Sequence, residues 1–385
     1  VLTEPLEFSP IYHAVYFRLD STNKAENNFK YVYKITVGSV TRKINVRPEP
    51  INGYGVIDIQ NHLKDFLIED IFDITDVDFQ DAPKAEYVVK IDESYIDGGG
   101  NPVLNVDEHI FTEKIAYNTR FSRNELFGDL SAYEISTATP GKLLVNIKPL
   151  TTVFQDDLFF IHFIGTLLVA FKPARLQIYE LNSSGGLLAT TLITGDLDTN
   201  SQLVTMDLGL ITFNALTKFI QFRLINLDSN PITESIRLRI EERECSTYSE
   251  VKLIYLDAKG SYNSLNFDGA KSRKVNVKSK AFRQFIDPLT DNELSRGIQK
   301  YFIDSTEIIT INTFMTEDNH NIMFEDLIKS PRVFMDLRNN TEFDNMDFAP
   351  IEILERRFNP METVNAQIPQ YEIDIRFAFE EVNRL

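Results

Sequence analysis

The feature that most constrains this sequence is a regular alternation of apolar and polar residues. Successive side chains of an extended strand point to opposite faces, so apolar residues at every second position indicate a half-buried strand. In residues 28–39 this pattern places Phe29, Tyr31, Tyr33, Ile35 and Val37 on one face. The same spacing returns near the end, at Tyr371, Ile373, Ile375, Phe377 and Phe379. The sequence therefore predicts sheets with one buried face.

The composition agrees with a mainly β fold. The 385 residues include 29 Phe and 15 Tyr but no Trp, and aromatic residues favour strands. Between 133 and 245, short strand patterns alternate with turn signals, which is typical of a β-sandwich or jelly roll. Strands are expected there at 141–149 (GKLLVNIKP), 157–163, 167–181 and 235–242, among others.

The length suggests more than one domain. We expect an N-terminal β domain at 1–132, a β-sandwich at 133–245 and a C-terminal α+β domain at 246–385. Two helices are predicted. One covers 58–69, with Asp58 capping its first amides and an apolar stripe at Ile59, Leu63, Phe66 and Leu67. The other covers 316–329 and ends before Pro331.

The sequence offers no pattern for catalysis or for a cofactor. The five histidines lie far apart and are expected at the surface or half-buried, and Cys245 is the single cysteine. The acidic segment 69–81 lacks the residue order of a calcium loop and is interpreted as a solvated strand face. Nucleotide-binding and nucleophile-elbow motifs are absent from the sequence. We therefore expect a protein without enzymatic activity, without a bound metal and without an organic cofactor.

Charge and hydropathy limit the partners. A net charge of −18 disfavours specific nucleic-acid binding, which needs a basic surface to replace phosphate counterions. The longest apolar run, 158–171, contains His162 and Gly165 and is too short to span a bilayer. We expect neither a nucleic-acid clamp nor a membrane span.

One segment is basic, although the chain as a whole is acidic. The strand pattern at 271–283 carries the basic residues Lys271, Arg273, Lys274, Lys278, Lys280 and Arg283. In a self-assembling protein such a patch can meet an acidic face of a neighbouring copy and fix its register. The sequence predicts these six residues as a candidate inter-subunit contact. A plain solvated strand face is the equally supported alternative.

The segment 245–282 also carries a resemblance. It reads as a hairpin of the form YLD-x-x-G-x-Y-x-x-x-x-F, from Tyr255 to Phe267, followed by the basic strand. Together with the opening at 6–21 (LEFSPIYHAVYFRLDS) and the ending at 370–381 (QYEIDIRFAFEE), it resembles structural proteins from the tail or baseplate of phages that infect Bacteroidetes.

The resemblance implies a virion protein that is assembled in the host cytoplasm and located in the tail region. It implies a homo-oligomeric ring or collar in the tail, baseplate or tail adaptor, which holds other tail proteins or fibres around the DNA channel. It brings no catalytic residue with it. The alternative is a glycan-binding or adhesin-type β-sandwich, since jelly rolls often serve as lectins. The absence of Trp, a common sugar platform, weighs against that alternative.

Overall fold

The computed structural model shows a mainly β protein, as the sequence predicts. It describes residues 3–5, 8–67, 78–81, 84–119, 133–135, 140–155, 157–165, 175–194, 201–208, 211–226, 228–241, 250–283, 298–313, 320–338, 347–354 and 371–378. The chain forms two compact units. The first contains Val1–Asn146, Leu158–Arg237 and Asp257–Ser261, and the second contains Ile147–Asp157, Leu238–Leu256 and Tyr262–Leu385. The three successive domains expected from the sequence stay a prediction.

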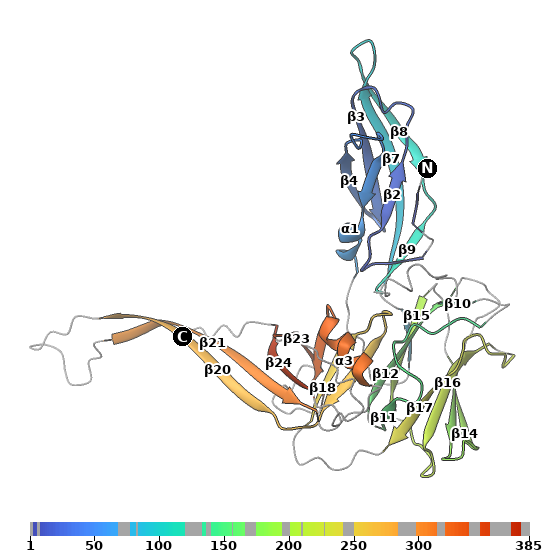
Figure 1. The fold of residues 1–385 in the computed structure, drawn as a ribbon, viewed down its shortest axis with the longest axis vertical. Helices are drawn as coiled ribbons and strands as arrows, with labels where there is room; N and C mark the ends of the chain where they lie inside the picture. Colours follow the sequence, from blue (N-terminus) through green and yellow to red (C-terminus); the bar gives the residue numbers. More distant parts are fainter. Residues whose placement is uncertain are drawn as a thin grey trace, which may run out of the picture. The chain divides into compact units, whose positions relative to one another are not determined.

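A mainly antiparallel sheet, in which only β1 and β9 pair in parallel among the described strands, forms the N-terminal part of the first unit (Figure 1). Its order is β1-β9-β7-β3-β4, and β8 pairs with β7 as well. The bounds are β1 Phe8–Pro10, β3 Asn27–Val37, β4 Val40–Val46, β7 Lys84–Ile96, β8 Pro102–Ile110 and β9 Lys114–Tyr117. The alternation predicted in β3 is confirmed, because Phe29, Tyr31, Tyr33 and Ile35 are buried.

The apolar face of this sheet packs against a two-stranded antiparallel sheet and a short helix. The covering elements are β2 Tyr16–Leu19, β5 Gly55–Asp58 and α1 Gln60–Lys64. Phe17, Ile57 and Leu63 from these elements share one buried cluster with Tyr33 of β3 and Val89 of β7. Burial of this aromatic-rich cluster is the main stabilising contribution in this part of the unit.

Helix α1 is shorter than the predicted helix 58–69. The Asp58 carboxylate accepts the amides of Gln60 and of Val15, each at 3.0 Å, so it binds the first helical amide, but the N-cap residue is Ile59 and not the predicted Asp58. After Lys64, the amides of Phe66 and Leu67 bind carbonyls three residues earlier, which tightens the last turn and ends the helix. Residues 68 and 69 lie outside the described residues.

Two further groups of strands belong to the first unit. In one, β12 pairs with β10 and β15, and β15 pairs with β6; in the other, β13 lies between β14 and β16. The bounds are β6 Asp78–Asp81, β10 Glu134–Ile135, β12 Leu158–Gly165, β13 Arg175–Leu181, β14 Leu187–Thr194, β15 Ser201–Asp207 and β16 Phe219–Ile225.

The strand predicted at 141–149 is wrong. Only isolated bridges form there, from Gly141 to Thr233 and from Leu144 to His162. The apolar residues Leu143, Leu144 and Val145 are consecutive and all buried, so the segment lacks the two faces of a ladder strand.

In its described residues, the second unit is a sheet with one helix on it. The order is β20-β21-β24-β23-β22-β18-β19, and β11 pairs with β17 in parallel. The bounds are β11 Thr152–Phe154, β17 Ile236–Glu241, β18 Val251–Leu256, β19 Tyr262–Phe267, β20 Ser272–Arg283, β21 Ile298–Asn312, β22 Val333–Asp336, β23 Phe348–Ile353 and β24 Glu372–Phe377.

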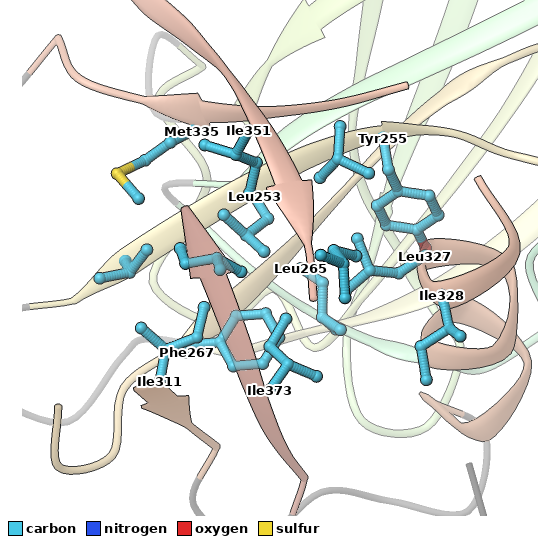
Figure 2. Packing of buried hydrophobic residues seen from close by; sticks show 14 of the residues in the cluster. Leu253, Tyr255, Leu265, Phe267, Ile311, Leu327, Ile328, Met335, Ile351 and Ile373 are labelled. Atoms are coloured by element: carbon cyan, nitrogen blue, oxygen red, sulfur yellow. The ribbon is translucent and has the colours of Figure 1, made fainter. Parts of the chain in front are cut away.

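Helix α3, His320–Lys329, completes the α+β arrangement predicted for the C-terminal part. Its Leu327 and Ile328 enter the same buried cluster as Leu253, Leu265 and Phe267 of the sheet (Figure 2). The α3 residue Phe324 also stacks on Tyr371, with ring centroids 3.9 Å apart. The predicted start at 316 lies outside the described residues.

Candidate functional site

The predicted basic segment forms an exposed ribbon with β21 (Figure 1). Every residue from Lys271 to Phe282 is exposed, which holds for no other long strand of the described chain. On its other side, β21 pairs with β24 only from Ile309 to Asn312. Residues 298–308 of β21 therefore pair with β20 alone among the described strands. We call β20 and residues 298–308 together the ribbon.

The strand register divides the basic residues between two faces. Lys274, Lys278 and Lys280 alternate along β20 on one face, opposite Ile308, Asp304 and Phe302. The other face carries Arg273 together with Val275 and Val277, whose side chains are 52% and 57% exposed. The ribbon thus has a lysine face and a face with exposed valines.

The six predicted contact residues do not form one patch. The structure brings Lys274, Lys278 and Lys280 together, whereas Arg273 on the opposite face donates to Glu307 at 2.6 Å. Lys271 precedes the strand and is exposed. Arg283 ends the strand, and its side chain lies outside the described residues.

The ribbon has the properties of a docking element. Isolated two-stranded ribbons are marginally stable in water, because they lack a buried face. Besides the two valines, Phe282 and Ile298 expose 46% and 66% of their surface. Lysines on an edge strand also hinder unwanted pairing, so the exposure alone fits the solvated-face alternative too. The exposed apolar residues favour the contact.

The hairpin motif of the sequence has a structural role. The turn predicted at residues 258–260 is confirmed, and Gly260 takes a φ of +86° there. The buried Asp257 carboxylate accepts the amides of Lys259 and Ser261, at 2.8 and 2.9 Å, and the amide of Asn146 at 2.9 Å. These residues hold a turn and offer no reactive group.

The histidines do not converge on a metal site. Among the described residues, no group of three or more His, Cys, Asp or Glu could hold a metal ion. The expectation of surface or half-buried histidines is wrong for His162, which is completely buried. Its burial lowers the pKa of the imidazole to about 4, against a weaker opposing effect of the Gly260 backbone. The apolar run LFFIHFIG around it was the available sequence signal.

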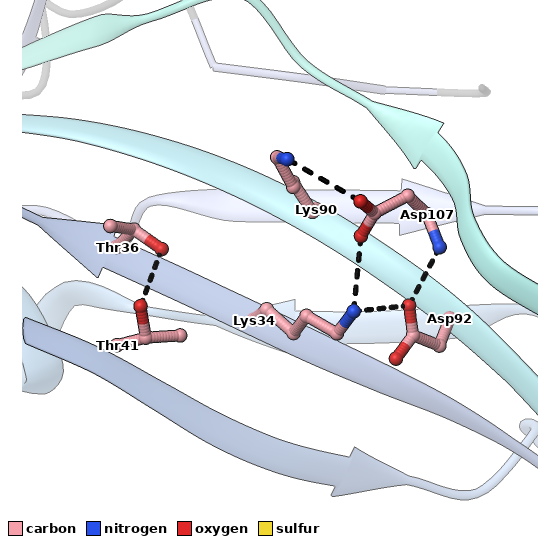
Figure 3. A network of polar contacts seen from close by, with 6 residues as sticks. All are labelled: Lys34, Thr36, Thr41, Lys90, Asp92 and Asp107. Atoms are coloured by element: carbon pink, nitrogen blue, oxygen red, sulfur yellow. Dashed lines mark hydrogen bonds and ion pairs between the residues drawn. The ribbon is translucent and has the colours of Figure 1, made fainter.

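A polar network on the N-terminal sheet is the other cluster of charges (Figure 3). The Lys34 ammonium lies 2.7 Å from Asp92 and 3.0 Å from Asp107, and the Asp107 amide donates to Asp92 at 2.7 Å. Asp107 has a φ of +51° where the pairing of β7 with β8 is irregular. Hydrogen bonds to Asp92 raise the pKa of Lys34. The network fixes this irregularity, which is a structural function.

We expect Asp92→Ala to destabilise the first unit by about 2 kcal/mol, because it removes a buried acceptor and leaves Lys34 and the Asp107 amide without it. Urea unfolding followed by tyrosine fluorescence measures this. Asp65, an exposed partner of Arg42, is the control, and Asp65→Ala should change stability by less than about 0.5 kcal/mol. Equal losses in the two variants would contradict the structural role.

None of the described helices is both long enough and apolar enough to cross a membrane.

The ribbon is the main candidate for a functional surface, because it is exposed, basic and only two strands wide. No protein-family model matches this sequence, and no curated protein matches it.

Proposed function

We propose that the chain is a structural virion protein of a tailed phage. Several copies form a ring or collar in the tail, baseplate or tail-adaptor region and hold neighbouring tail proteins or fibres around the DNA channel. The protein acts through contact surfaces, without catalysis and without a cofactor, in virions assembled in the host cytoplasm. The observation that carries the proposal is the exposed basic ribbon on an acidic chain.

Charge contrast supports contact between copies. The chain has a net charge of −18, while β20 contains basic residues and no acidic residue. The lysine face of one copy would meet an acidic surface of the next. Complementary charge steers association and sets register, and repetition around a symmetric ring multiplies modest contacts.

The glycan-binding alternative has less support. The partly exposed face of β13 and β16 carries the aromatic residues Tyr179 and Phe219. The guanidinium of Arg223 lies 5.3 Å from the centre of the Tyr179 ring, and that of Arg237 lies 4.2 Å from the Phe219 ring. These cation–π contacts cover the ring faces on which a sugar would stack.

Reversing the lysine face tests the proposal. We expect Lys274→Glu, Lys278→Glu and Lys280→Glu together to reduce oligomer formation and particle incorporation at least about tenfold, since a loss of about 1.4 kcal/mol per contact suffices. The subunit should stay folded, because these side chains are solvent-exposed. Mass photometry and quantification of the protein in purified particles provide the two readouts.

A charge-matched variant serves as the control. Lys43→Glu, Lys142→Glu and Lys218→Glu change the net charge equally at exposed sites of the first unit, and assembly should persist. High salt should weaken wild-type assembly by screening. If the ribbon variant assembles as well as the control variant, the lysine face is merely solvated and the proposal loses its support.

A further inference from the structure

Among the described strands, each strand of the ribbon is paired along one long edge only. β20 is the last strand of its sheet, and β21 has no described partner beside β20 along residues 298–308. An edge strand presents a row of amide and carbonyl groups that can pair with another strand. A third strand would also stabilise a ribbon that exposes Val275 and Val277.

The two edges differ in charge, and this difference restricts which strands of two copies can pair. β20 carries only basic charged residues: Arg273, Lys274, Lys278, Lys280 and Arg283. In the open part of β21, the register puts Asp304 on the lysine face and Glu307 on the opposite face, where it accepts from Arg273 of its own chain; Lys300 lies beyond the irregularity at Lys280. Pairing β20 with the β20 of another copy would place lysines across from one another, which is destabilising. Pairing β20 with the β21 of another copy brings opposite charges together.

We infer that β20 of one copy pairs antiparallel with residues 298–308 of β21 in the next copy. The inference rests on the proposed ring and names its contact. β20 and β21 are antiparallel within one chain, and in the proposed ring the two strands run along the ring axis, so that rotation about this axis keeps their direction. The next β20 is therefore antiparallel to β21 and keeps its lysine face on the same side. The contact joins two different edges, which is the kind of interface that closes into rings.

Disulfide trapping between separate copies tests this pairing. In a Cys245→Ser background, one population carries Asn276→Cys and a size tag. Three other populations carry Asp304→Cys, Thr306→Cys or Ile308→Cys. Asn276 lies opposite Thr306 in the register, so all four positions share a face. Opposed residues of antiparallel strands are about 4.5–5.5 Å apart at Cα, within disulfide range. After mild oxidation, at least one mixture should give a crosslinked dimer of tagged and untagged chains.

Two controls use the same strands. Asn276→Cys alone should not link to itself, since β20 does not meet β20. Ser305→Cys lies on the opposite face and should not link to Asn276→Cys. Self-linking of Asn276→Cys overturns the inference, as does failure of all three mixtures while mass photometry shows an intact ring. In these cases the proposed ring still stands. If wild-type protein forms no ring, the proposed function and this inference both fail.

Discussion

Gly260→Ala is expected to destabilise the first unit by about 3 kcal/mol or more. Gly260 has a φ of +86°, and a left-handed backbone costs other residues about 1–2 kcal/mol. A Cβ atom would also lie 2.4 Å from the Asn118 carbonyl oxygen and 2.6 Å from the Thr119 methyl group. Such overlap in a packed site typically adds about 1–3 kcal/mol. Urea unfolding followed by far-ultraviolet circular dichroism measures the loss.

Gly100→Ala separates the two causes. Gly100 has nearly the same φ, +83°, but no atom lies within 4 Å of its Cβ position. Its replacement should cost only the backbone component, about 1–2 kcal/mol. If Gly100→Ala and Gly260→Ala lose equal stability, the close packing of the turn on Asn118 contributes nothing, contrary to our expectation.

His162→Phe is expected to remove an acid-sensitive part of the stability. Burial lowers the pKa of His162 from 6.5 to about 4, so the unfolded chain binds more protons between these values. The stability of the wild type is therefore complete above pH 6.5 and falls as the pH decreases towards 4, by about 3 kcal/mol in total. Phenylalanine cannot take up this proton and retains an aromatic ring beside Tyr117.

The measurement is the difference in unfolding free energy between His162→Phe and wild type at several pH values from 7 to 4. Taking this difference cancels the titration of the acidic residues that both proteins share. His62→Asn, at a partly exposed histidine on α1, should follow the wild type throughout. A constant difference between His162→Phe and wild type across this range would contradict the prediction.

Local patterns predicted much of the fold. The burial of alternate residues in β3 and in β24 follows from periodicity within single strands, which needs no knowledge of partners. The positions of α3 and of the turn at Gly260 likewise follow from short-range signals. These elements could be predicted from the sequence because the interactions that determine them lie within a few residues.

The candidate site depended on contacts that no local pattern contains. The division of the six basic residues into two faces requires the register of β20 with β21, including its shift after Lys280. The ion pair of Arg273 with Glu307 joins residues 34 positions apart. Likewise, the segment 141–149 does not form the predicted strand, and the amide of Asn146 instead donates to the Asp257 carboxylate, 111 positions later. Such pairings are tertiary and override local propensity.

The discontinuous first unit has a consequence for synthesis on the ribosome. Domains generally fold as units while the chain emerges from its N-terminus. Here Asp257–Ser261 belongs to the first unit, where Asp257 holds Asn146 and the Ser261 hydroxyl donates to the Phe160 carbonyl. The first unit can therefore gain its last contacts only after the turn has been translated. A nascent chain that pauses before residue 257 would present an incomplete core to chaperones.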